Sequence, residues 1–421
     1  MKKTKWMQKA IPLSSVTDTQ DFSDLQGLKE VLANVRYIGL GESTHGTREF
    51  FQLKHRMLAF LVKEMGYRVF AIEAGSLPCQ NINDYVLYGK GDRAAALTSQ
   101  GYWTWDTEEV TDLIEWMRQH NLHCQRDEIC QFIGYDIKPV DETYAQIRRL
   151  MPKAYFADEE LARIAELLSK EQLNSAENVE AKEKILKLHG NVMLYDCEIR
   201  ANIGQTGYDL LKHCTEMLWQ DYSAMKALEG DAIDRDKFMA ENIFQMVRSL
   251  PADTKVVIWA HNAHIAIDPV WKNMGYRLQE EFGDLYYPAA LTFTRGSFQS
   301  RLMLKQERRH YEMGDLQEFE VGEPRQDFWE NDLKTFSKGD YFLDFRALKK
   351  ETSFRTWAMD QEMQMFGAGG GFVPFDDKPQ GDDIFGKCAL GKHFDGVFHI
   401  HETTRARPNP TGIRVKGQKS K

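Results

Sequence analysis

Titratable side chains lie at the ends of several short apolar runs in the sequence. They are Glu42, His45, Glu73, Asp136 and His261. Histidines beside carboxylates can supply a general base, a partner that orients it and a general acid. The residue types therefore indicate acid–base chemistry, and the direct activation of water by a histidine is its simplest form.

The apolar runs before these side chains are predicted to be buried β-strands. They are rich in β-branched and aromatic residues and mostly lack polar alternation, which is typical of strands covered on both faces. The predicted strands span residues 35–40, 68–73, 131–135, 255–260, 287–293, 341–345 and 396–400. Ligands of open α/β sheets bind outside the carboxyl ends of the strands. If these strands run parallel, the titratable side chains converge on one crevice.

Helical periodicity fills the intervals between the strands. Apolar residues recur at helical spacing over residues 50–65, with Gly66 as a stop signal, and again over residues 108–120. Residues 141–250 continue this spacing far beyond the length of one strand-to-strand crossover. We predict an α/β fold with a mainly parallel sheet flanked by helices. An inserted helical lobe is expected to cover the crevice at the carboxyl ends of the strands.

The predicted organisation has four parts. Residues 1–140 and 251–402 form the two parts of the α/β core, residues 141–250 form the helical lobe, and residues 403–421 form a basic flexible tail. Residues 367–381, which are rich in glycine and proline, are predicted to be a flexible loop.

The amino-acid composition argues against several classes of function. The 421 residues include 63 acidic and 54 basic side chains, and the resulting net charge of −9 argues against nucleic-acid binding. No apolar stretch approaches the roughly 18 residues of a membrane helix, and no secretion signal is predicted. The six cysteines form no Cys-x-x-Cys pair and are expected to be reduced thiols in a cytoplasmic protein. We expect a small-molecule partner, and the oligomeric state stays open.

Five residues near the predicted crevice are candidates for substrate binding: His264, Trp103, Trp105, Asp106 and Asp136. Structural interpretations compete with this assignment. Asp136 could cap a following helix, and His264 could be a hydrogen-bonded core histidine. The two tryptophans could be core residues or an apolar platform for a bulky substrate.

The spacing of the polar residues also leaves a metal site open. Glu42 and His45 are three residues apart, as are His261 and His264, which resembles the spacing of metal ligands. Neither pair matches the His-Glu-x-x-His helix of zinc peptidases. No Gly-x-Ser-x-Gly elbow is present, and Ser43 is interpreted as a turn residue. We therefore favour chemistry without a cofactor.

Six segments, in the same order, resemble the erythromycin esterase family. They are residues 41–51 (Gly-Glu-Ser-Thr-His-Gly-Thr-Arg-Glu-Phe-Phe), 71–74, 103–109, 235–242, 260–265 (Ala-His-Asn-Ala-His-Ile) and 394–398. The resemblance covers about residues 20–400. It implies an α/β core with a helical lobe over the crevice. It also implies a hydrolase that opens the lactone ester of macrolide antibiotics with activated water, without a covalent serine intermediate or a required metal, and thereby confers antibiotic resistance.

The resemblance assigns roles residue by residue. It makes His45 the general base, surrounds it with Glu42 and Glu73, and places His261 and His264 in the same site. One position departs from the family pattern, because the arginine expected nine residues after the catalytic histidine is Lys54. Lysine keeps the charge and loses the bidentate fork of arginine, which bears more on the substrate than on the reaction.

We predict a carboxylic ester hydrolase with the catalytic residues His45, Glu42, Glu73, His261 and Lys54. His45 deprotonates water, while Glu42 and Glu73 orient and tune it. His261, with Lys54, stabilises the oxyanion or protonates the leaving alcohol, although Lys54 could instead hold Glu42. Two alternatives remain. One is a metal-dependent hydrolase that uses the same Glu/His cluster on a non-macrolide substrate, and the other is a non-catalytic small-molecule binding protein.

Overall fold

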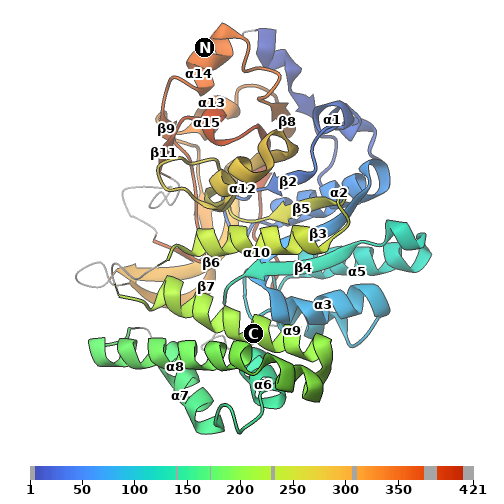
Figure 1. Ribbon diagram of the computed structural model, residues 1–421. Helices are drawn as coiled ribbons and strands as arrows, with labels where there is room; N and C mark the ends of the chain where they lie inside the picture. Colours follow the sequence, from blue (N-terminus) through green and yellow to red (C-terminus); the bar gives the residue numbers. More distant parts are fainter. Residues whose placement is uncertain are drawn as a thin grey trace.

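A ten-stranded β-sheet forms the centre of the computed structural model, which describes residues 5–138, 141–170, 172–228, 233–305, 311–373 and 386–410 (Figure 1). Its strands are β1 (Ile11–Pro12), β2 (Tyr37–Leu40), β3 (Tyr67–Gly75), β4 (Gln131–Asp136), β5 (Lys255–Trp259), β6 (Tyr286–Lys305), β7 (Tyr311–Val321), β8 (Tyr341–Asp344), β10 (Gly371–Phe372) and β12 (Gly396–Thr403). Two further strands, β9 (Met363–Gln364) and β11 (Lys387–Cys388), pair with each other.

The sheet is mixed, with a parallel centre and antiparallel additions. The strand order is β1-β8-β12-β6-β2-β5-β3-β4, and every neighbouring pair from β12 to β4 is parallel. In contrast, β8 and β1 are antiparallel to their neighbours, and β7 is antiparallel to β6. Because β7 is the next strand along the chain after β6, it can pair antiparallel without a crossover. The prediction of a mainly parallel sheet therefore holds for the centre and misses these strands.

Helices occupy the segments between the strands. Among them, α2 (Arg48–Met65) joins β2 to β3 and ends at Gly66, whose left-handed φ of 75° suits glycine. The other α-helices are α1 (Gly27–Val31), α3 (Ser76–Tyr88), α4 (Arg93–Thr98), α5 (Glu108–His123), α6 (Asp141–Leu150), α7 (Asp158–Ser169), α8 (Ser175–Leu194), α9 (Asp196–Met225), α10 (Arg235–Ser249), α11 (Asn262–Ile265), α12 (Met274–Phe282), α13 (Trp329–Leu333), α14 (Thr352–Ala358) and α15 (Leu390–His393). Short 3₁₀ helices are η1 (Lys5–Lys9), η2 (Ser23–Leu25), η3 (Arg126–Glu128) and η4 (Gly283–Leu285).

Two hydrophobic cores cover the two faces of the sheet. Helices α2, α3 and α5 pack on one face, whereas α10, α12 and α14 pack on the other. Consecutive residues of β5 alternate between the cores, as Val257 and Trp259 face the first and Val256 and Ile258 the second. Burial on both faces explains why this strand is continuously apolar in the sequence.

Four helices that follow β4 form a third hydrophobic core of their own. They are α6 to α9, which lie together beside β4 at the bottom of the view in Figure 1. Their buried side chains, such as Ile147, Ile164, Ile185 and Leu211, pack together and against Leu77 of α3. Helix α10 packs against the sheet, although the sequence grouped it with these helices. The division of the chain into domains stays a prediction.

The carboxyl-terminal segment is held against the core over part of the predicted tail. The backbone N–H of Thr404 donates to Glu49, and that of Arg407 donates to Glu109. Residues 411–421 lie outside the described residues. In the predicted loop 367–381, residues 371–372 form β10 instead and pair with β6, whereas 374–381 lie outside the described residues.

Two expectations about the class of protein can be compared with the structure. All six cysteines are free, as the sequence predicts. Within the described ranges, no helix has the length and apolarity that crossing a membrane requires.

A close backbone approach gives a test of the fold near the turn after β2. A Cβ atom added to Gly46 would lie 2.0 Å from the carbonyl oxygen of Gln299, so the backbone would have to move. We expect Gly46→Ala to lower the free energy of unfolding by about 1–3 kcal/mol in urea denaturation. The matched control is Gly190→Ala in α8, where the added Cβ meets no atom within 4 Å. That variant should be more stable than the wild type by about 0.5–1 kcal/mol. Equal stability of the two variants would contradict the close contact between Gly46 and Gln299.

Candidate active site

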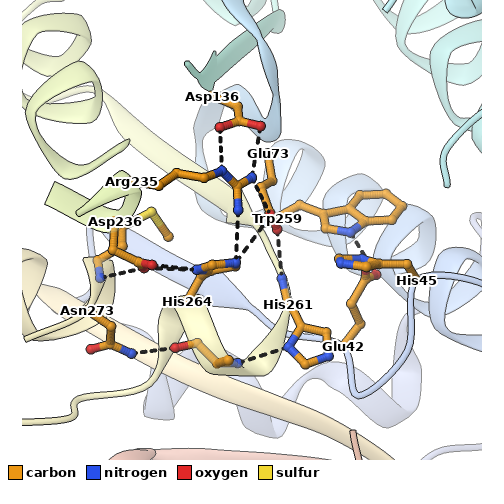
Figure 2. Close-up of polar contacts among 12 residues, drawn as sticks. Glu42, His45, Glu73, Asp136, Arg235, Asp236, Trp259, His261, His264 and Asn273 are labelled. Carbon is orange, nitrogen blue, oxygen red and sulfur yellow. Dashed lines mark hydrogen bonds and ion pairs between the residues drawn. The ribbon is translucent and has the colours of Figure 1, made fainter. Parts of the chain in front are cut away.

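The predicted polar residues converge at the carboxyl ends of four neighbouring parallel strands (Figure 2). Glu42 and His45 lie in the turn after β2, and Glu73 lies within β3. Asp136 ends β4, and His261 follows β5. The parallel direction assumed for these strands is therefore confirmed, and it is the reason why residues far apart in the sequence meet.

Glu42 and His45 form a buried carboxylate–imidazole pair. The Nδ1 atom of His45 lies 2.6 Å from Oε1 of Glu42. Burial by itself raises the pKa of Glu42, but Lys54 and His45 outweigh it and hold that pKa below its usual range. The ionised carboxylate accepts the Nδ1 hydrogen, which leaves Nε2 as the basic nitrogen. No described residue hydrogen bonds to Nε2, and His45 is part of the wall of the main pocket.

Lys54 lies behind Glu42 and away from the pocket. Its Nζ atom donates to Oε2 of Glu42 at 2.7 Å, and the Nε1 atom of Trp259 donates to the same oxygen at 2.8 Å. The lysine is completely buried and packs over the Trp259 ring. Burial lowers the pKa of Lys54 to about 8, although Glu42 opposes the shift. Of the two predicted roles, the structure supports holding Glu42, because a buried ammonium group cannot reach a substrate oxyanion.

A second network joins Glu73 to Arg235 and Asp136 (Figure 2). Arg235 donates from Nη2 to Oε1 of Glu73 at 2.8 Å, and its Nε and Nη2 atoms bind both oxygens of Asp136. Tyr102 donates to Asp136 at 2.7 Å. Burial raises the pKa of Glu73, but His264, Arg235 and His45 together bring it well below its usual range. Asp136 therefore binds this arginine, rather than acting as the predicted helix cap.

His264 lies between two carboxylates as a partly buried cation. Its Nδ1 atom is 2.8 Å from Asp236, and its Nε2 atom is 3.3 Å from Glu73. Burial lowers the pKa of His264, but Glu73 and Asp236 outweigh this effect and raise it to about 9. The histidine is absent from the pocket wall, so its predicted contact with the substrate becomes a supporting role for Glu73.

His261 is a neutral histidine with both nitrogens engaged. Its Nε2 atom donates to the carbonyl of Ser43 at 3.2 Å, and its Nδ1 atom accepts from the backbone N–H of Ala263. Burial lowers its pKa to about 3, with His45 and His264 adding to the shift. A neutral ring in this arrangement carries no proton for a leaving alcohol. Its ring centroid lies 5.1 Å from that of His45, so the two rings pack against each other.

A cavity of about 880 Å³ opens between this polar cluster and helices α6, α7 and α9. The sheet side contributes His45, Glu73, Asp136 and Arg235. Trp103, Trp105 and Tyr102 form an aromatic part of the wall, as the predicted platform requires. The opposite wall includes apolar side chains of the helices, among them Ala165, Leu168 and Met225. Such a large, partly apolar cavity suits a bulky organic molecule.

Asp106 lies outside the pocket wall. Its carboxylate accepts hydrogen bonds from Thr98 and Asn409, and it thereby ties the carboxyl-terminal segment to the turn before α5. Its side chain is buried among these partners, so the structure does not bring Asp106 together with the other predicted substrate-binding residues.

The sequence interpretation missed Arg235, Asp236 and Tyr102. Arg235 begins α10, where the positive end of the helix dipole disfavours a cation. This unusual placement is the sequence signal that could have identified it. Tyr102 precedes the predicted tryptophans directly, but the need of Asp136 for a second donor is visible only in the structure.

Several donor atoms of the candidate metal ligands already have hydrogen-bond partners, whereas Nε2 of His45 has none among the described residues. Both oxygens of Glu42 accept hydrogen bonds, and Nε2 of His261 binds the Ser43 carbonyl. The described ranges contain no group of three or more His, Cys, Asp or Glu side chains arranged to hold a metal ion.

The charge on His264 predicts how stability depends on pH. Its folded-state pKa of about 9 lies above the ordinary 6.5, so its ion pairs stabilise fully below pH 6.5 and are lost as the pH rises through 9. At about 1.4 kcal/mol per pKa unit, the wild type should lose about 3 kcal/mol more than His264→Gln between these limits. Urea denaturation across this range measures the difference. Parallel stability curves for the two proteins would show that His264 is not a partly buried cation.

Comparison with known proteins gives this geometry a family context. The family model described as erythromycin esterase matches residues 62–403. Erythromycin esterase type II of Escherichia coli is 23% identical over 96% of this chain and 98% of its own length.

Solved structures share the fold. A Bacillus cereus protein has a TM-score of 0.74 at 23% identity, covering 96% of this chain and 98% of its own. A mutant of the erythromycin esterase EreC in its open conformation has a TM-score of 0.69 at 15% identity, covering 96% of this chain and 100% of its own. The family model spans most of the sequence, and the chain therefore belongs to the erythromycin esterase family.

Proposed function

We propose that the protein hydrolyses the lactone ester of a macrolide or a related bulky ester with water activated by His45. The observation that carries this proposal is the Glu42–His45 pair, whose basic nitrogen belongs to a histidine in the wall of a large cavity. Family membership supports esterase chemistry, and the size of the cavity supports a bulky substrate.

The first step in this mechanism is the attack of water. Nε2 of His45 accepts a proton as the water oxygen forms a bond to the ester carbonyl carbon, and the carbonyl electron pair moves onto its oxygen. The buried, ionised Glu42 stabilises the resulting imidazolium through the Nδ1 hydrogen. No covalent bond to the protein forms.

The tetrahedral intermediate then breaks the carbon–oxygen bond of the ester. His45 returns its proton to the leaving alkoxide, since the neutral, engaged His261 holds none to give. Arg235 takes the role of oxyanion stabiliser that the sequence assigned to His261 and Lys54. Its guanidinium lines the cavity, where Nε and Nη2 bind the two carboxylates and Nη1 lies 3.3 Å from Nε2 of His264.

Replacement of His45 tests the proposed base. We expect wild-type protein to convert erythromycin to a product heavier by one water, and His45→Ala to reduce kcat by about a hundredfold or more. Mass spectrometry of the reaction mixture gives the readout. His123→Ala is the matched control, because this histidine is exposed on α5, far from the cluster. A folded His45→Ala protein with wild-type turnover would refute the role of His45, and an inert wild type would remove erythromycin as a substrate.

Replacement of Lys54 tests whether this lysine holds Glu42 or contacts the substrate. Lys54→Met leaves Glu42 buried without its cation, so we expect kcat to fall at least about tenfold while KM stays unchanged. Lys54→Arg restores the charge with the residue that the family resemblance places here, and it should recover most of the activity. Steady-state kinetics with melting temperatures measure both effects. A rise in KM without a change in kcat would instead place Lys54 in contact with the substrate.

A further inference from the structure

Asp221 is a buried carboxylate in the cavity wall that no described residue binds. It belongs to α9, is 9% exposed and lines the cavity opposite the catalytic cluster. In the described part of the chain, no residue forms a hydrogen bond or ion pair with it, whereas Glu73 and Asp136 in the same wall are held by Arg235. Burying a charge without a partner is costly, so we expect a ligand to bind the Asp221 carboxylate.

The surroundings of Asp221 disfavour its ionised form. Burial raises the pKa of Asp221 to about 6, even though Lys226 and Lys138 oppose the shift. Neither lysine pairs with it, because Lys226 donates to the carbonyl of Lys170 and Lys138 lies over the Tyr102 ring at 4.8 Å. The carboxylate also lies near the carboxyl-terminal end of α9, whose partial negative charge disfavours an anion.

The neighbouring side chains define what could bind there. Leu168, Ala165 and Met225 present apolar surface in the same wall, so a bulky aliphatic group packs beside the carboxylate. Tyr144 contributes a phenol to the same cavity wall. Burial raises the pKa of Tyr144, and the nearby Asp221 raises it further. Asp141 and Arg148 of α6 also line this wall. Apolar surface beside the Asp221 carboxylate is complementary to an alkylated ammonium group, which combines a positive charge with hydrocarbon.

We propose that Asp221 is a specificity-determining residue that binds a protonated amine on the part of the substrate remote from the ester. This inference rests on the proposed function, because it selects among bulky esters those that carry a basic nitrogen. Asp221 forms no bond with the reacting atoms, so its contribution appears in binding and KM.

The test separates binding from turnover. Calorimetric binding of erythromycin, which carries a tertiary amine, is compared with that of its N-oxide, which keeps the shape and loses the ionisable proton. The protein is His45→Ala, so that no ligand is consumed. We expect erythromycin to bind about tenfold to a hundredfold tighter than the N-oxide, as for a charged hydrogen bond. Asp221→Asn in the same background should remove this preference and leave N-oxide binding within about twofold.

The control removes a carboxylate charge from the same helix, at a position outside the cavity wall. Asp209→Asn, an exposed position on α9, should preserve the preference for the amine. Melting temperatures verify that each variant is folded, and Asp221→Asn should melt no lower than its parent. Equal binding of both ligands, a preference that survives Asp221→Asn, or no binding of either ligand would overturn the inference. Amine-selective binding without water addition by the wild-type protein would instead overturn only the proposed function.

Discussion

The site depends on a carboxylate that water does not reach. Glu42 is completely buried, and an isolated charge there would cost several kcal/mol. Three donors from separate segments offset that cost: Lys54 from α2, Trp259 from β5 and His45 from its own turn. Since each donor must keep its position for the carboxylate to stay ionised, the same contacts fix the orientation of the His45 ring. Burial of the anion thus couples the packing of α2 and β5 to the basicity of His45.

A second set of charges lies next to this pair, and three of its members, Glu73, Asp136 and Arg235, line the cavity. Along it, carboxylates and cations alternate, from Asp136 through Arg235 and Glu73 to His264 and Asp236. Each carboxylate contacts at least one cation, which is the condition for stable burial of charge. The set connects β3, β4, α10 and α11. It therefore fixes the positions of these two helices relative to the strand ends.

The cavity combines two walls of different character. The sheet contributes a polar wall whose hydrogen bonds are largely satisfied, which suits a catalytic surface that must not rearrange during the reaction. Helices α6, α7 and α9 contribute a wall that combines apolar side chains with the charged Asp141, Arg148 and Asp221. Catalysis and selectivity therefore come from opposite sides of the same space. Changes in the helices can alter the preferred substrate without disturbing the Glu42–His45 pair.

The sequence alone determined the central strands and, on the assumption that they run parallel, the cluster at their ends. Continuous apolar runs and the glycine-flanked turn after β2 are local patterns, and the carboxyl ends of parallel strands must meet at one edge. Tertiary structure decided the role of each side chain, because charge state depends on burial and on partners from distant segments. Lys54 and His261 are indistinguishable from substrate-binding groups in the sequence, yet one is sealed behind Glu42 and the other is neutral. The contacts of Arg235 and Asp221 became visible only when α10 and α9 were placed near the strand ends, since no local spacing encodes those contacts.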